Sequence, residues 1–161
     1  MINYNADEIF EMAIKAEHNA AKMYADLANK HKDPTVANEL KKLSEMESDH
    51  EKIFTKMREE LPEHMRTTML DPDDISTMYL DAVADASVPE GSPQKAKKFT
   101  GDESFEDILR FAIDTEKGAV LFYLGIRDMV PARLGKDKIE AIIKEEQMHA
   151  AILTKRLKSL R

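Results

Sequence analysis

Apolar residues recur at every third or fourth position along four long segments of the chain. This spacing places them on one face of an α-helix, whereas a half-buried β-strand would alternate apolar and polar residues. The pattern therefore predicts four helices, at about residues 6–30, 34–60, 104–130 and 137–160.

Helix-start signals stand at the beginning of each segment. In three cases a residue that can cap a helix precedes an acidic residue by three positions, the spacing of a capping box. These pairs are Asn5 with Glu8, Ser104 with Asp107, and Asp137 with Glu140. The second segment opens instead with Asp33 and Pro34, a capping residue followed by proline at the first helical position.

The connection between the second and third segments, residues 61–103, is much longer than the other two. Prolines and glycines interrupt it, but an apolar face over residues 73–86 predicts a short helix, with a loop at 89–100. Short connections imply antiparallel neighbours, and a connection of this length can run along a whole bundle. We expect an all-α, antiparallel four-helix bundle with one long crossover, formed by residues 1–161 as a single domain.

A charged residue interrupts the apolar stripe of every predicted helix at mid-length. Glutamate is rarely buried, so its position on a core stripe is unusual. The stripes read Ile9, Ala13, Glu17, Ala20, Tyr24, Leu27; then Leu40, Leu43, Glu47, His50, Ile53, Met57; then Leu109, Ala112, Glu116, Ala119, Tyr123, Ile126; and Ile139, Ile142, Glu146, His149, Ile152, Leu157.

The two halves of the chain repeat these unusual residues at one offset. Subtracting 17 from 116, 24 from 123, 47 from 146 and 50 from 149 gives 99 each time. The pairs are Glu17 with Glu116, Tyr24 with Tyr123, Glu47 with Glu146, and His50 with His149. We interpret each half as a helical hairpin, with a glutamate on its first helix and Glu-x-x-His on its second, that arose by duplication.

The repeated residues predict a two-metal site. Residues three apart on a helix share a face, so each Glu-x-x-His pair can point at one spot, and the two lone glutamates complete six ligands. Four carboxylates and two dications sum to zero charge, whereas four ionised carboxylates without metal would each cost several kcal/mol of desolvation. No Lys or Arg recurs on these faces, which disfavours internal salt bridges as the alternative. The other histidines, His18, His31 and His64, fall outside the pattern, and we expect no metal role for them.

Composition narrows the function classes. The chain has no cysteine, which excludes disulfides, thiolate metal sites, iron–sulfur clusters and cysteine nucleophiles. Its net charge of -7 disfavours nucleic acid and anionic membranes as partners. No apolar run is long enough for a membrane span and no signal-peptide pattern stands at the start, so we expect a cytoplasmic protein.

The complete set resembles the rubrerythrin family of the ferritin-like superfamily. The segments that carry the resemblance are Glu17-His-Asn-Ala-Ala-Lys-Met-Tyr24, Glu47-Ser-Asp-His50, Glu116-Lys-Gly-Ala-Val-Leu-Phe-Tyr123 and Glu146-Gln-Met-His149. The resemblance covers roughly residues 5–60 and 104–160 and implies a ferritin-like fold, in the form that lacks a rubredoxin domain.

The resemblance implies a centre of two iron ions. Its ligands would be Glu17, Glu47, His50, Glu116, Glu146 and His149. Glu47 and Glu146 would bridge the ions, and the hydroxyls of Tyr24 and Tyr123 would hydrogen-bond ligand carboxylates. Rubrerythrins use such a centre, in its diferrous state, to reduce hydrogen peroxide, so the resemblance implies an oxidoreductase acting on hydrogen peroxide (or dioxygen). It also implies a homodimer.

Two departures from the family pattern leave other hypotheses open. Rubrerythrins commonly carry a seventh carboxylate where this chain has Ala119, with Ala20 as its repeat mate. Without cysteine, electrons must come from a separate donor protein or from ferrous iron itself. The residue types alone also suit Mn or Zn in place of iron. The alternatives are a ferroxidase that handles iron, and a non-catalytic helical bundle with a structural metal.

Overall fold

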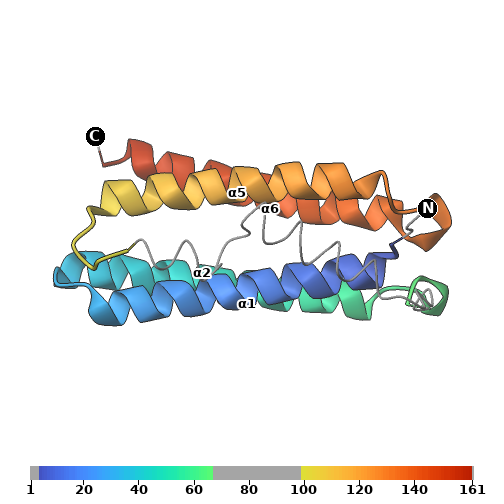
Figure 1. Cartoon of the computed structure of the whole chain (residues 1–161), viewed down its shortest axis with the longest axis horizontal. Coiled ribbons are helices and arrows are strands. Elements are labelled where there is room, and N and C mark those ends of the chain that lie inside the picture. The colour runs from blue at the N-terminus through green and yellow to red at the C-terminus, as the bar shows by residue number, and fades with distance from the viewer. Residues whose placement is uncertain (1–3, 67–98, 161) are drawn as a thin grey trace.

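The computed structural model describes residues 4–66 and 99–160, and the long helices among them form two antiparallel hairpins that lie side by side (Figure 1). The first hairpin consists of α1 (Ala6–Lys30) and α2 (Pro34–Glu59), and the second of α5 (Phe105–Arg127) and α6 (Lys136–Lys158). Two 3₁₀ helices, η1 (Glu63–Met65) and η2 (Ala132–Leu134), follow α2 and α5. The described residues contain no β-strand, so the predicted all-α four-helix bundle is confirmed.

The directions of the helices require one long crossover. In Figure 1, α2 ends at the right-hand end of the bundle, whereas α5 begins at the left-hand end. The end of α2 and the start of α5 therefore lie at opposite ends of the bundle, whereas each of the other two connections joins neighbouring helix ends. Residues 67–98 lie outside the described residues, as do the short helix predicted at 73–86 and most of the loop predicted at 89–100.

Three of the four helix starts are capped as the sequence predicts. At α1 the capping box is complete, because Glu8 donates its backbone N–H to Asn5 Oδ1 at 2.9 Å and accepts that of Asn5 at 3.0 Å. At α2 the Asp33 carboxylate accepts the backbone N–H of Thr35 at 2.7 Å. At α5 the Ser104 hydroxyl accepts the backbone N–H of Asp107 at 3.1 Å. These side chains satisfy N–H groups that a helix start leaves without intrahelical partners.

The fourth start was predicted wrongly. Helix α6 begins at Lys136, one residue before the expected cap Asp137, and its cap is Gly135 in a left-handed conformation with φ of 96°. No side chain caps this end. The Glu140 carboxylate accepts a hydrogen bond from Arg127 at 2.6 Å and thereby ties α6 to the end of α5. Gly135 follows η2 directly and precedes the first residue of α6, so the helix begins at this turn without a side-chain cap.

Two apolar clusters fill the bundle, one toward each end. The cluster at the end where α1 begins includes Ile9, Phe10, Phe54, Ile126 and Ile139. The cluster at the opposite end includes Leu27, Leu40, Ile108, Leu109 and Leu153. The interrupting glutamates and histidines lie along the helices between these two clusters, so they are enclosed by apolar packing on both sides.

One repeat pair of the predicted core is wrong. Ile53 and Ile152 were expected on the core stripes, but they are 38% and 49% exposed. The residues that follow them, Phe54 and Leu153, are fully buried instead. The residue four positions after each histidine of the Glu-x-x-His motifs faces inward. The residue three positions after it points toward the flank of the helix.

Glycines allow close contact between the hairpins at both ends. A side chain at Gly101 would place its Cβ 2.9 Å from the carbonyl oxygen of Lys30, and one at Gly135 would place it 2.6 Å from the Ala6 Cβ. Both glycines have positive φ, which L-residues rarely adopt. Near Gly101, a ring nitrogen of His31 also lies 2.9 Å from the Glu103 carbonyl oxygen.

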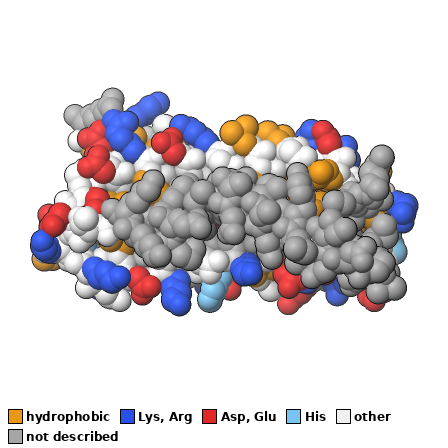
Figure 2. Space-filling view, viewed as in Figure 1, with side chains coloured by type: hydrophobic (Ala, Val, Ile, Leu, Met, Phe, Trp, Pro, Cys, Tyr) orange, Lys and Arg blue, Asp and Glu red, His pale blue; other side chains and the backbone are white. Residues whose placement is uncertain are grey.

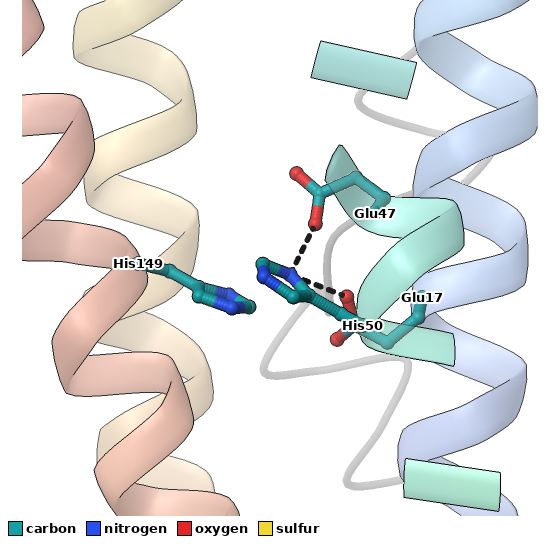
Figure 3. A group of neighbouring side chains, drawn as sticks. All are labelled: Glu17, Glu47, His50 and His149. Atoms are coloured by element: carbon teal, nitrogen blue, oxygen red, sulfur yellow. Dashed lines mark hydrogen bonds and ion pairs between the residues drawn. The ribbon is translucent and has the colours of Figure 1, made fainter. Parts of the chain in front are cut away.

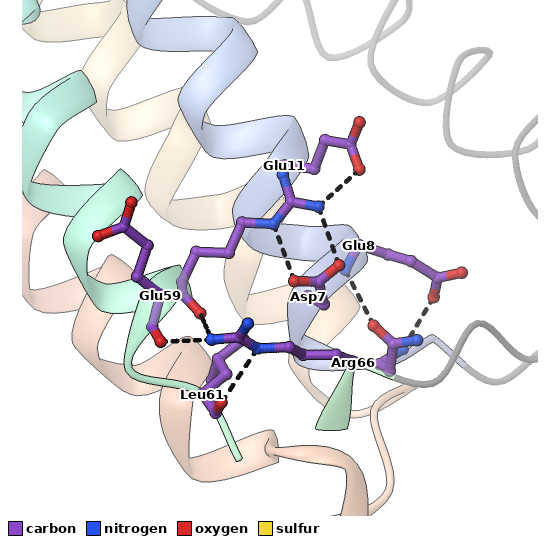
Figure 4. Close-up of polar contacts among 8 residues, drawn as sticks. Asp7, Glu8, Glu11, Glu59, Leu61 and Arg66 are labelled. Atoms are coloured by element: carbon purple, nitrogen blue, oxygen red, sulfur yellow. Dashed lines mark hydrogen bonds and ion pairs between the residues drawn. The ribbon is translucent and has the colours of Figure 1, made fainter. Parts of the chain in front are cut away.

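Arg58 ties the end of α2 to the start of α1, and Arg66 braces the turn that follows α2 (Figure 4). Arg58 donates to both carboxylate oxygens of Asp7, at 2.8 and 2.9 Å, and to Glu11 at 3.0 Å. Arg66, just beyond η1, donates to the carbonyl oxygen of Leu61 at 3.1 Å. A bidentate arginine–carboxylate pair has a defined geometry, so it holds the two helices of the first hairpin at a fixed position relative to each other.

The visible surface carries charges of both signs in alternation. In Figure 2 the Lys and Arg side chains are interspersed with Asp and Glu side chains and do not form a single basic stripe. Among the described residues, no helix has the length and apolar content needed to cross a membrane.

Gly125 and Gly135 on the second hairpin predict opposite stability effects. A Cβ at Gly125, inside α5, would meet nothing within 4 Å, so Gly125→Ala should remove only the helix penalty of glycine. We expect it to raise the free energy of unfolding by about 0.5–1 kcal/mol. Thermal unfolding followed by circular dichroism measures this as a midpoint higher by roughly 1–4 °C.

Gly135→Ala is the matched control, because the same substitution there meets both a positive φ and the Ala6 side chain. We expect this variant to unfold at a lower temperature than the wild type. A Gly135→Ala protein as stable as Gly125→Ala would contradict the packing described for the end of the bundle.

Candidate metal centre

Six acidic and basic side chains meet in the middle of the bundle, three from each hairpin. They are Glu17 from α1, Glu47 and His50 from α2, Glu116 from α5, and Glu146 and His149 from α6. All six are buried. The structure thus brings together every residue that the sequence singled out as a candidate ligand.

The first hairpin provides one group of ligand atoms (Figure 3). His50 Nδ1 lies 3.3 Å from a carboxylate oxygen of Glu47 and 3.7 Å from one of Glu17. Glu47 and His50 are one helical turn apart on α2, and Glu17 reaches the same place from α1. The Glu-x-x-His spacing therefore places its two side chains on one spot, as expected.

The second hairpin repeats this arrangement. His149 Nδ1 lies 3.4 Å from a carboxylate oxygen of Glu116 and 3.4 Å from one of Glu146. In both hairpins, then, the same ring nitrogen faces one carboxylate from each helix. The duplication inferred from the 99-residue offset appears in the structure as two matching half-sites.

The two half-sites touch through their histidines. The imidazole rings of His50 and His149 are stacked, with centroids 3.0 Å apart and planes inclined by 15°. A ring nitrogen of His149 also belongs to the first group: the ligand atoms of Glu17, Glu47, His50 and His149 all lie within 4.8 Å of one another. Glu116, Glu146 and His149 form the second group within the same distance.

Burial dominates the electrostatics of the centre. It raises the pKa of Glu17 well above the ordinary value of 4.5, and the neighbouring carboxylates of Glu146 and Glu47 act in the same direction, although His50 opposes them. Burial also lowers the pKa of His149, against the effect of Glu146. Without a cation, the site therefore favours a neutral Glu17 and a neutral His149.

Tyr123 lies within the electric field of this centre. Burial raises the pKa of its hydroxyl well above 10.0, and the carboxylates of Glu146, Glu17 and Glu116 raise it further. Its repeat mate Tyr24 is fully buried as well. The proton therefore stays on Tyr123. The predicted hydrogen bonds from both tyrosines to ligand carboxylates stay predictions.

The side chains present suit divalent metal ions. Among the described residues, no Lys or Arg forms an ion pair with Glu17 or Glu146; their basic neighbours are the histidines. Glu17 Oε2 and His149 Nε2 are buried and make no hydrogen bond within the same part of the chain. Buried polar atoms without partners are rare. Oxygen and imidazole donors in this number could hold Fe, Mn or Zn.

The other histidines lie outside the groups of potential metal ligands in the described residues. His18 is exposed, with its ring 3.3 Å from Glu51 on the outer surface of the first hairpin. Neither His31 nor His64 belongs to a group of potential metal ligands in residues 4–66 and 99–160. Ala20 is buried and Ala119 partly buried at the repeated position where a further carboxylate was considered. Thr115, which the sequence did not single out, is buried next to Glu116, but its hydroxyl donates to the Phe111 carbonyl at 2.9 Å.

Comparison with known families agrees with this arrangement. The family model described as Rubrerythrin matches residues 8–99, which is more than half of the chain. The chain belongs to the rubrerythrin family. No curated protein and no solved structure matches it.

The rubrerythrin match covers the first half-site only. It includes Glu17, Tyr24, Glu47 and His50, but it ends before α5. The second half-site is connected to the family by the internal repeat and by the equivalent distances around His149. Rubrerythrins are di-iron carboxylate proteins, so the family and the buried groups both indicate a metal centre.

The raised pKa of Glu17 predicts how the metal-free protein responds to pH. A carboxyl group with a raised pKa in the folded state stabilises the fold below its unfolded pKa, and this contribution is lost as pH rises through the folded value. We therefore expect the free energy of unfolding of the wild type, relative to Glu17→Gln, to fall as pH rises above about 4.5. Urea denaturation of both proteins in the presence of a chelator measures this difference.

The comparison isolates Glu17, because His149 and the other carboxylates are common to both proteins. His18→Gln is the control: this histidine adjoins Glu17 in the chain but is exposed. A stability difference between the wild type and Glu17→Gln that does not change with pH would show that Glu17 is not desolvated as described.

Proposed function

We propose that the protein is a rubrerythrin-like di-iron oxidoreductase that reduces hydrogen peroxide (or dioxygen). The observation that carries the proposal is the pair of matching Glu–Glu–His groups, one from each hairpin, buried against each other at mid-bundle. Membership in the rubrerythrin family supports iron as the metal. The six side chains proposed as ligands are those that form the two groups.

Charge balance supports two cations and not one. The centre contains four carboxylates, and two divalent ions bring its formal charge to zero with both histidines neutral. A neutral His149 agrees with its lowered pKa and is the form that binds metal. One ion would leave two buried negative charges, each at a cost of several kcal/mol.

The residues of the chain have distinct roles in this proposal. Glu47 and Glu146 lie one helical turn before the histidines on α2 and α6, and we assign them as the carboxylates that would hold both metal ions. Glu17 and Glu116 each complete one group from the other helix of the hairpin. Two bound ferrous ions would supply one electron each. Reduction of one hydrogen peroxide to two waters requires two electrons.

Apolar packing gives the centre a dry environment. The two core clusters enclose it from both ends, and one of them includes Tyr123, whose hydroxyl keeps its proton. We propose that Tyr24 and Tyr123 orient the ligand carboxylates by hydrogen bonds. A low-polarity surrounding strengthens the interactions of the metals with their ligands, and it keeps solvent from competing with the oxidant.

The source of electrons lies outside the chain. Because there is no cysteine, the chain has no iron–sulfur module of its own. We propose a separate electron-donor protein as the reductant. The same observation favours a second candidate function, a ferroxidase, in which ferrous iron from solution is both substrate and electron source.

Rapid mixing of the protein, loaded anaerobically with two ferrous ions per chain, tests the oxidoreductase. We expect hydrogen peroxide or dioxygen to oxidise the iron in a fast phase that accounts for both ions. Glu47→Gln and Glu146→Gln should each reduce the rate of the fast phase by about tenfold or more. His18→Gln, outside the centre, should react like the wild type. Absence of rapid oxidation by either oxidant contradicts the proposal.

Repeated additions of ferrous iron separate the two candidate functions. A peroxide reductase oxidises its own two ions once and then stops until a reductant is added. A ferroxidase turns over with each addition and accumulates ferric product, which light scattering detects.

A further inference from the structure

The two groups of ligand atoms share one histidine, and the sharing is one-sided. His149 belongs both to the group with Glu17, Glu47 and His50 and to the group with Glu116 and Glu146. His50 belongs to the first group alone. The internal repeat predicts equivalent half-sites, so this difference comes from how the hairpins are placed against each other.

The ligand atoms of the first group are already close to the spacing that a single four-ligand site requires. Its four ligand atoms lie within 4.8 Å of one another. Two ligand atoms bound to one ion at about 2.0–2.2 Å are at most about 4.4 Å apart. A contraction of a few tenths of an ångström brings the separations into that range, and the stacked imidazole rings must also turn so that a nitrogen of each points at the same ion. Figure 3 shows the His149 ring reaching across from α6 toward His50, Glu47 and Glu17.

Charge favours the same group for a lone ion. Two carboxylates and two neutral imidazoles make a divalent cation formally neutral. The second group, if His149 is engaged elsewhere, retains only the carboxylates of Glu116 and Glu146. Two oxygen ligands are too few for a tight site, so the second group is complete only when it recovers His149.

Solvent access also differs between the half-sites. The His50 side chain is 11% exposed, whereas that of His149 is 1% exposed. An ion that arrives from solution therefore reaches the first hairpin's side of the centre more readily. Access, charge and ligand number all point to the same order of binding.

We propose that the centre fills stepwise, with His149 changing its partner between the two steps. The first divalent ion binds Glu17, Glu47, His50 and His149. The second ion binds Glu116 and Glu146 and takes His149 from the first. This inference rests on the proposed two-metal function, and it adds to it an order of loading and a role for one residue.

The exchange makes the two binding steps unequal. The first ion loses one imidazole when the second binds, so part of the free energy of the second step is spent on that loss. Such coupling between sites typically changes an affinity by about five- to 150-fold. We therefore expect two separate dissociation constants for the metal-free protein, the second weaker by about tenfold or more.

Calorimetric titration of the full-length, metal-free protein with cobalt(II) tests the order. His149→Ala should weaken binding of the first cobalt ion by about tenfold or more, because His149 is one of its four ligands. Glu116→Gln should weaken the second ion but leave the first within about twofold of the wild type. Its repeat mate Glu17→Gln should weaken the first. The two variants change equivalent positions of the repeat, yet one should weaken binding of the second ion and the other binding of the first.

Nitrogen NMR of the wild type gives a reading that does not depend on folding of the variants. With one equivalent of zinc(II), the imidazole nitrogens of both His50 and His149 should shift by the change typical of metal ligation. Ligation of His50 alone at one equivalent would overturn the proposal. So would a single binding step for two ions, or a first-ion affinity that His149→Ala leaves unchanged. In each of those cases the two-metal function itself survives, whereas failure to bind any divalent ion contradicts that function.

Discussion

The structure depends on one electrostatic constraint, the burial of four carboxylates at the same depth in an apolar bundle. Each ionised carboxylate would cost several kcal/mol there without a partner, which is comparable to the whole stability of a domain of this kind. The raised pKa of Glu17 is a direct consequence of this burial. His50 and His149 lie beside these acids, and burial keeps His149 neutral. Divalent cations relieve the constraint because they supply positive charge and ligand bonds together.

The rest of the fold places those acids accurately. Caps at Asn5, Asp33 and Ser104 determine where three helices begin, and the apolar stripe of each helix determines which residues face inward at mid-bundle. Close contacts at Gly101 and Gly135 hold the two hairpins together at both ends. The apolar clusters between these ends and the centre then leave the ligand side chains little freedom. Because the hairpins are repeats, one local design produces both half-sites.

Much of the fold could be predicted from the helical spacing of apolar residues. Much of the candidate site could be predicted because glutamate is rarely found among the apolar residues of a helix's buried face. The start of α6 could not, since a left-handed glycine and a preceding turn replaced the side-chain cap that Asp137 suggested. Ile53 and Ile152 were misplaced because helical periodicity allows a step of either three or four residues, and only packing decides between them. The sharing of His149 depends on the relative position of two hairpins, which no local pattern encodes. The family model likewise recognises the first hairpin but not the second.

Anomalous diffraction at the iron absorption edge, from crystals of iron-loaded protein, tests the central claim most directly. The account predicts two strong peaks per chain, enclosed by Glu17, Glu47, His50, Glu116, Glu146 and His149, with ligand atoms at about 2.0–2.2 Å. Peaks elsewhere on the chain, or an unaltered cluster of carboxylates with no peak between them, would contradict it.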